Sequence, residues 1–292
     1  MTLKDPYDRP VTNLRISLTP ACNLRCIYCH AEGESSPGGL LSTAELAEIM
    51  RVAAGFGIRS VKFTGGEPTL REDLAGIIAS VPAGMECSMT TNGTLLAGIA
   101  DDLRRAGLSR VNVSIDSLNP ETYRRISGCD MLGEVLEGIE AALEAGLTPV
   151  KLNMVVLQGI NDHEVEDFIR FVKGNRNLIL QVIELMEFRG CDHHQGLAGL
   201  EQRLAERSRE IVTRRMHHRK KYCLDGSEVE VVRPLHNTEF CAFCNRLRVT
   251  SDGKLKPCLL RPDNHVDVRG LSGEAMEAAF REAVQRRAPF YR

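Results

Sequence analysis

Three cysteines, Cys22, Cys26 and Cys29, stand in a C-x3-C-x2-C pattern directly after a short apolar segment. Thiolates this close on one loop can ligate three irons of a [4Fe-4S] cluster and leave the fourth iron open. An open iron of this kind is what reductive cleavage of S-adenosylmethionine requires. A zinc site would need a distant fourth ligand. The nearest candidate, His30, adjoins Cys29 too closely for easy simultaneous ligation. Inert thiols are the remaining alternative.

A second triplet lies near the other end of the chain, where Cys241, Cys244 and Cys258 form a C-x2-C-x13-C pattern. One interpretation is a zinc ribbon with Cys223 or His236 as the fourth ligand. The other is a second cluster, because three ligands without an obvious fourth again leave a metal position open. Spacing alone does not decide between them.

Basic residues accompany both triplets. Arg246 and Arg248 are two apart on a predicted strand, so both side chains point to one face beside the second triplet. Paired guanidinium groups suit a phosphate-bearing or otherwise electron-rich substrate. Arg15 and Lys151 interrupt apolar strands, and because an unpaired buried charge is costly, we expect both to face a polar pocket.

Composition excludes some classes of partner. The chain has 292 residues and 43% apolar content, and Lys+Arg 37 against Asp+Glu 39 gives a net charge of −2. The chain therefore has no overall excess of positive charge that would indicate nucleic acid or an anionic membrane as a partner. No signal peptide and no run of 18 apolar residues is found, so we predict a cytoplasmic protein. In a reducing compartment cysteines act as metal ligands or buried thiols. The roles of four stay open, with the first two treated as ordinary thiols: Cys87, Cys129, Cys191 and Cys223.

The first part of the chain alternates apolar, β-prone runs with amphipathic helical stretches. The predicted strands are Asn13–Leu18, Ser60–Thr64, Glu86–Thr91, Arg110–Ile115, Pro149–Leu157 and Leu178–Leu185. The predicted helices are Ser42–Gly55, Glu72–Ser80, Leu95–Ala106, Pro120–Ile126, Met131–Ala145 and Asp162–Gly174. Six βα units in series predict an α/β fold, a partial (β/α)6 TIM-like barrel whose site lies at the carboxyl ends of its strands.

The alternation stops at about residue 190. We therefore predict a barrel over residues 1–190 and a C-terminal region, residues 191–292, that carries the second triplet and covers the open side. This region is expected to hold a loop at Arg189–Gln195, a helix at Leu197–Met216 and hairpin strands at Tyr222–Val232 and Arg246–Pro257. Its one notable charge run is Arg214–Lys221. Four histidines in polar settings are expected to be solvated: His193, His194, His217 and His218.

The first triplet, with Tyr28 before its last cysteine, resembles the signature of radical S-adenosylmethionine enzymes. Thr64-Gly-Gly-Glu-Pro68 is similar to the GGEP motif of that superfamily, which receives the methionine amino group. Its glycines let the main chain approach an ammonium, and Glu67 is expected to add charge. The run from Cys244 to Leu259 (CNRLRVTSDGKLKPCL) resembles the C-terminal motif of the GTP 3′,8-cyclases of molybdenum cofactor biosynthesis. Other segments in family order include Thr90–Gly93, Arg110–Ser117, Val150–Asn153, Gly159–Asp162 and Ile183–Met186.

The resemblance implies a role for each matching residue. Cys22, Cys26 and Cys29 would bind the radical-generating cluster, and Cys241, Cys244 and Cys258 a second [4Fe-4S] cluster. The S-adenosylmethionine pocket would be lined by Tyr28, Gly66, Ser114 and Met186. GTP would be bound by Arg15, Lys62, Thr90, Lys151, Arg246, Leu247 and Arg248, of which Arg246 and Arg248 would be catalytic.

The implied reaction is the conversion of GTP to (8S)-3′,8-cyclo-7,8-dihydro-GTP. A 5′-deoxyadenosyl radical would take the ribose 3′ hydrogen, and the resulting carbon radical would attack C8 of guanine. The implied partners are a reductase, ferredoxin or flavodoxin as electron donor and the downstream cyclic pyranopterin monophosphate synthase. The chain would act as a monomer or a homodimer.

Four features depart from the common family pattern. Lys62 stands where many members have arginine, Ser60 where many have lysine, and Gln181 where arginine is frequent. The printed chain ends at Arg292 without the Gly-Gly tail of many members, as in an archaeal-type branch. Two rival functions stay open: a two-cluster radical enzyme acting on a peptide or another nucleotide, and a zinc-bound binding module without turnover.

Overall fold

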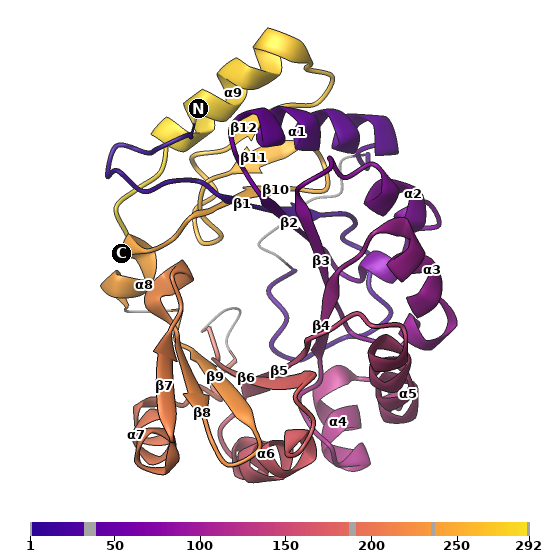
Figure 1. Ribbon diagram of the computed structural model, residues 1–292, viewed down its shortest axis with the longest axis vertical. Helices are drawn as coiled ribbons and strands as arrows, with labels where there is room; N and C mark the ends of the chain where they lie inside the picture. The colour runs from indigo at the N-terminus through magenta and orange to yellow at the C-terminus, as the bar shows by residue number, and fades with distance from the viewer. Residues whose placement is uncertain (1, 32–38, 187–190, 235–236, 291–292) are drawn as a thin grey trace.

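The computed structural model describes residues 2–31, 39–186, 191–234 and 237–290. Among them a single twelve-stranded sheet has the order β12-β11-β10-β1-β2-β3-β4-β5-β6-β9-β8-β7. It curves around a central space, with helices on its outer side (Figure 1). The parallel strands are β1 (Asn13–Ser17), β2 (Ser60–Thr64), β3 (Glu86–Thr91), β4 (Arg110–Ser114), β5 (Val150–Val156), β6 (Leu178–Glu184), β9 (Glu228–Val232) and β10 (Arg246–Val249).

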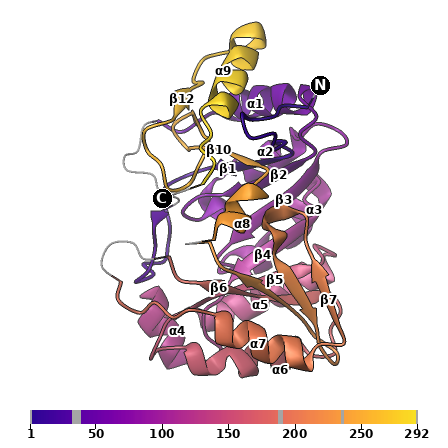
Figure 2. The same ribbon diagram turned by 90° about the vertical axis from the view of Figure 1, so that its left-hand side faces the viewer.

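Each of the six predicted strands and each of the six predicted helices is present, with two helices after β4. The helices that follow β1 to β5 cover the outer face of the sheet (Figures 1 and 2). They are α1 (Thr43–Gly55), α2 (Leu74–Ala79), α3 (Ala100–Ala106), α4 (Pro120–Ser127), α5 (Leu132–Glu144) and α6 (Val165–Val172). Ser42 begins α1 with a capping box, in which its side chain and that of Glu45 satisfy each other's backbone N–H groups.

Successive side chains of each strand point alternately to the hydrophobic core and to the inner face of the sheet. On β2, Val61 and Phe63 are fully buried in the hydrophobic core, whereas Ser60 and Lys62 lie on the other face. The same period of two places polar side chains of the neighbouring strands on the inner face. The sheet thus turns its apolar face to the helices and its polar face inward.

The expected barrel is confirmed, but the parallel run is longer than six strands. β10 pairs in parallel with β1, and β9 pairs in parallel with β6, so the C-terminal region adds one strand at each end of the barrel. β11 (Lys254–Lys256) and β12 (Val266–Asp267) extend one end, and β8 (Lys220–Cys223) and β7 (Glu210–Thr213) the other, all antiparallel. The hairpin predicted over Arg246–Pro257 is present as the antiparallel pair β10 and β11.

The helix predicted over Leu197–Met216 is wrong in its second half. Helix α7 covers only Ala198–Arg207, and Ser208 leaves it in an extended conformation. The β-branched residues that follow form β7, which pairs with β8 in the register Ile211↔Tyr222. Pairing with the next strand along the chain, β8, here prevails over local helical propensity.

Two further helices complete the chain. α8 (Thr238–Ala242) carries Cys241, and α9 (Gly273–Gln285) packs beside α1, where the rings of Phe280 and Phe56 lie 6.0 Å apart. No helix among the described residues is long and apolar enough to cross a membrane.

Candidate functional site

A cavity of about 400 Å³ lies on the inner face of the sheet and draws its walls from both halves of the chain. Cationic side chains dominate its charged lining, against one carboxylate, that of Glu184. The cations are Arg15, Lys62, Arg110, Lys151, Arg219, Arg246 and Arg248. Such a lining favours a ligand with several negative charges.

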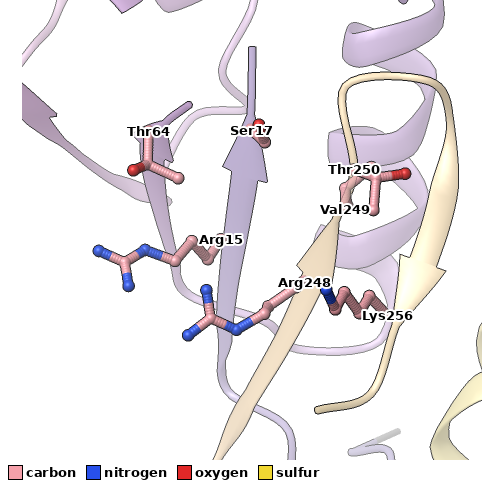
Figure 3. Close-up of a pocket in the computed structure, with 7 residues that line it drawn as sticks. All are labelled: Arg15, Ser17, Thr64, Arg248, Val249, Thr250 and Lys256. Atoms are coloured by element: carbon pink, nitrogen blue, oxygen red, sulfur yellow. The ribbon is translucent and has the colours of Figure 1, made fainter. Parts of the chain in front are cut away.

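One row of cations crosses three adjacent strands. Arg15 on β1 is the register partner of Arg248 on β10 and of Lys62 on β2. Figure 3 shows the guanidinium groups of Arg15 and Arg248 close together on one side of the sheet. Burial, followed by the nearby charge of Arg15, holds the pKa of Lys62 well below its usual range. Lys62 Nζ donates to Asn112 Oδ1 at 2.8 Å.

Arg246 lies in the same cluster of charge. Burial, then the charges of Arg15 and Arg248, lowers the pKa of Arg246. Its Nη2 is 3.4 Å from the sulfur of Met216, and its Nε is buried without a hydrogen-bond partner among the described residues. A guanidinium in this setting gains much from an anionic ligand.

The acidic counterpart is Glu230 on β9, which is fully buried. Lys151 Nζ and Arg214 Nη2 each lie 2.7 Å from its Oε1. Burial disfavours the carboxylate, but the charges of Lys151 and Arg219 prevail and hold the pKa of Glu230 at about 2. Burial also lowers the pKa of Lys151 to about 8, partly opposed by Glu230. Lys151 therefore lines the cavity as one half of an ion pair.

All three cysteines of the second triplet line this cavity. Two buried arginines bind the backbone of the first two of these cysteines. Arg9 Nη1 donates to the carbonyl of Cys241 at 2.8 Å, and Arg287 Nη2 donates to that of Cys244 at 2.5 Å. Both arginines also pair with the buried carboxylate of Asp5. Burial disfavours the Cys244 thiolate, but the charges of Arg287 and Arg246 lower its pKa. Cysteines in this setting fit a cluster.

The first triplet lies in the loop after β1, and the Gly-Gly turn after β2 docks onto this loop. The N–H of Gly66 donates to the carbonyl of Thr19 at 2.6 Å, and that of Glu67 to the carbonyl of Ala21 at 2.7 Å. A Cβ on Gly66 would lie 2.2 Å from the Ala21 oxygen. The close approach therefore requires glycine.

Glu67 does not have the expected role. Its carboxylate is fully buried and accepts hydrogen bonds from Thr69, from the Thr91 hydroxyl and from the N–H of Asn92. Burial raises its pKa, and these hydrogen bonds oppose the rise. The carboxylate therefore ties the turn to the end of β3 and is not presented to a ligand.

The donor set of the first triplet fits an open cluster. The three thiols are free, and the nearby thiols of Cys22 and Cys29 help to raise the pKa of Cys26, after the larger effects of burial and of Asp116. Tyr28 Oη donates to Asp116 Oδ2 at 2.7 Å, which fixes the loop against β4 and β5. Metal binding would replace the protons that this buried setting otherwise retains.

Most predicted site residues meet at the cavity. Those that line it are Arg15, Tyr28, Lys62, Lys151, Met186, Cys241, Cys244, Arg246, Arg248 and Cys258. Thr90 and Ser114 lie on the inner face by register, next to Asn112 and Asn153, but do not line the cavity. Leu247 does not fit a side-chain contact with a ligand, because it is fully buried in the core on the opposite face of β10.

Sequence reasoning missed Arg110, Arg219 and His217, which also line the cavity. The expectation of a solvated His217 is wrong: its side chain is buried, and its ring stacks on Phe240 at 3.7 Å. The alternation Arg110-Val-Asn112 on β4 was a usable signal for the first of these residues. No local sequence pattern identified Arg219 or His217 as a residue of the cavity.

Among the described residues, no three Cys, His, Asp or Glu side chains gather closely enough to hold a single metal ion. His236, one candidate fourth zinc ligand, lies outside the described residues, as do Arg189 and Gly190 of the loop predicted at Arg189–Gln195. The rest of that loop, residues 191–195, is irregular as predicted.

Comparison with known families divides the chain into two matched parts. Residues 16–172 match the model of the Radical SAM superfamily, and residues 178–292 match that of Molybdenum Cofactor Synthesis C. Among curated proteins, a probable GTP 3′,8-cyclase of Methanocella arvoryzae is 51% identical over 99% of this chain and 95% of its own length. One of Archaeoglobus fulgidus is 49% identical over 99% of both chains.

Solved structures share the fold at low identity. Streptococcus suis SuiB bound to S-adenosylmethionine superposes with a TM-score of 0.70 and 15% identity, over 94% of this chain and 69% of that one. Native anSMEcpe with bound AdoMet gives 0.62 and 18%, over 90% and 79%. These likenesses show the architecture alone.

Proposed function

Because this chain belongs to the GTP 3′,8-cyclase family of the radical S-adenosylmethionine superfamily, we propose that it converts GTP to (8S)-3′,8-cyclo-7,8-dihydro-GTP. The observation that carries the proposal is the cavity of about 400 Å³, in which the second cysteine triplet and seven cationic side chains share one lining. A nucleoside triphosphate needs both an anion-binding wall and a surface for its base.

Each triplet is proposed to hold one cluster. Cys22, Cys26 and Cys29 would hold the first [4Fe-4S] cluster, and Cys241, Cys244 and Cys258 the second. When bound, the first cluster supplies the electron for cleavage of S-adenosylmethionine to the 5′-deoxyadenosyl radical, which takes the 3′ hydrogen of GTP. The second would accept the guanine base, since its cysteines line the cavity.

The chain's own residues orient the reactants. We assign S-adenosylmethionine to the side of the cavity near Tyr28 and Met186, next to the first triplet, with Gly66 and Ser114 nearby. Gly66 fits because its turn already packs against the cysteine loop. Asp116 fixes Tyr28 by its hydrogen bond.

GTP is assigned to the cationic wall. Arg15, Lys62 and Arg248 form the row that would bind phosphate oxygens, and guanidinium groups do so in a bidentate manner. Arg246 lies closest in sequence to Cys244 and would act beside the base. Lys151 would contribute its charge from the ion pair with Glu230. Thr90 stays a proposed contact on the strength of its inner-face position.

The cellular setting is also proposed. A reductase, ferredoxin or flavodoxin would supply electrons, and cyclic pyranopterin monophosphate synthase would act on the product. We propose a cytoplasmic monomer or homodimer and retain the division at residue 190 as a description of the two functional parts.

The experiment is anaerobic reconstitution followed by incubation with S-adenosylmethionine, GTP and reductant. We expect about eight irons per chain, as two four-iron clusters, with 5′-deoxyadenosine and the cyclised nucleotide formed together. S-adenosylmethionine cleavage that is indifferent to GTP would contradict the substrate assignment. Stoichiometric zinc without iron would contradict the assignment of any radical enzyme activity to this chain.

A further inference from the structure

The segment Arg214–Arg219 connects β7 to β8 and contains most of the charge run noted in the sequence. Three of its side chains, Met216, His217 and Arg219, line the cavity. Its last residue reaches the cavity beside Arg246, whose guanidinium contacts the Met216 sulfur. These three residues of the segment therefore belong to the wall of the site, whereas Arg215 is exposed.

The backbone of this segment is held in an uncommon conformation. His217 and His218 have φ values of 61° and 47°, in the left-handed region that non-glycine residues seldom adopt. The surroundings enforce it: the ring of His217 stacks on Phe240, that of His218 on Phe243, and the His217 N–H donates to the Phe243 carbonyl at 3.0 Å. The segment is thereby locked to α8, the helix that carries Cys241.

Arg219 brings more positive charge than its surroundings balance. Lys151 and Arg214 already occupy Oε1 of Glu230, and the Nη1 of Arg219 stays 3.9 Å from Oε2. Its side chain is 17% exposed, and its Nε is buried without a hydrogen bond to any described residue. One carboxylate thus serves three cations. A buried donor left unpaired is costly unless a ligand accepts from it.

We propose that Arg219 binds the phosphate groups of the nucleotide, and that the stack of His217 on Phe240 holds it in position for this contact. The inference rests on the proposed function and adds a residue to its substrate site. A guanidinium matches phosphate oxygens through its planar set of donors. The stack also joins this contact to α8, the helix that carries Cys241. The same part of the protein would therefore position both the phosphate groups and the base of the nucleotide.

The test measures binding without turnover. Reconstituted holoenzyme with S-adenosylmethionine but no reductant is titrated with GTP and with guanosine, for the wild type and for Arg219→Ala. Arg219→Met is a second variant that keeps most of the side-chain volume. Arg215→Ala is the matched control, because Arg215 is exposed in the same segment and does not line the cavity. Iron content and circular dichroism establish that each variant is folded and loaded.

We expect both Arg219 variants to bind GTP at least about tenfold more weakly and guanosine within about twofold of the wild type. Arg215→Ala should match the wild type for both. Equal weakening for GTP and guanosine would show a structural role and overturn the inference. Unchanged GTP affinity in a folded Arg219→Met variant would also overturn it. Absence of GTP binding by the wild type would instead overturn the proposed function on which the inference rests.

Discussion

Arg15 and Arg248 are register partners on adjacent parallel strands, although β1 begins the barrel and β10 comes near the end of the chain. Their guanidinium groups lie close together on the same side of the sheet (Figure 3). Like charges so close repel each other: burial, followed by the charges of Arg15 and Arg248, lowers the pKa of the neighbouring Arg246. A polyanionic ligand would relieve this repulsion, which is why we place the phosphate groups of GTP here.

Replacing Arg248 by Ala should weaken GTP binding by about 10- to 100-fold, the range of one lost charge-assisted contact. S-adenosylmethionine binding should change little, because Arg248 is not among the residues proposed to bind it. Equilibrium binding of each ligand to the reconstituted protein measures both. Arg203→Ala, on the exposed face of α7, is the control. Equal losses for both ligands would point to misfolding.

GTP binding should weaken at high pH. Burial lowers the pKa of Lys151 to about 8, so this side chain loses its positive charge between pH 7 and pH 9. If binding requires the ammonium, affinity should fall about tenfold over that range. Lys151→Arg keeps its charge and should show a much smaller fall. If GTP affinity fell equally with pH for the wild type and for this variant, Lys151 would not be one of the phosphate-binding groups.

Gly66→Ala should abolish reductive cleavage of S-adenosylmethionine. The added methyl group would meet the Ala21 carbonyl oxygen at 2.2 Å and separate the Gly-Gly turn from the cysteine loop. Gly76→Ala is the matched control, because nothing lies within 4 Å of its added Cβ and the helix α2 tolerates alanine. Formation of 5′-deoxyadenosine is the measurement. Full activity of Gly66→Ala would refute the docking described here.

Mutations should separate the functions of the two cysteine triplets. Cys26→Ala should lose S-adenosylmethionine cleavage altogether, whereas Cys258→Ala should retain cleavage and lose cyclisation of GTP. Each variant should hold about four irons in place of about eight. Iron analysis and product chromatography distinguish the outcomes. Cleavage by Cys26→Ala would refute the role of the first triplet, and cyclisation by Cys258→Ala that of the second.

Local patterns predicted the barrel closely. The strands Ser60–Thr64 and Glu86–Thr91 were predicted with the bounds that the structure has, and the helix predicted over Ser42–Gly55 is present as α1 with Ser42 as its cap. These features depend on alternation and capping, which involve near neighbours in the sequence. The basic residues Arg15 and Lys151 were predictable for the same reason, since each interrupts an apolar strand.

Features that depend on distant pairing were not predictable. The parallel placement of β9 and β10 beside β6 and β1 joins segments with no local signal of their partner. His217 sits in a polar run, and only the ring of Phe240 and the left-handed backbone explain its burial. The saturated carboxylate of Glu67 likewise depends on Thr91 and Asn92 of another strand and its loop.

The central claim is that a radical made at the first triplet removes the ribose 3′ hydrogen of GTP held against the second. GTP carrying deuterium at C3′, incubated with the reconstituted protein, S-adenosylmethionine and reductant, tests it most directly. The account predicts 5′-deoxyadenosine that is heavier by one mass unit, together with the cyclised nucleotide. Unlabelled 5′-deoxyadenosine beside unchanged GTP would contradict it.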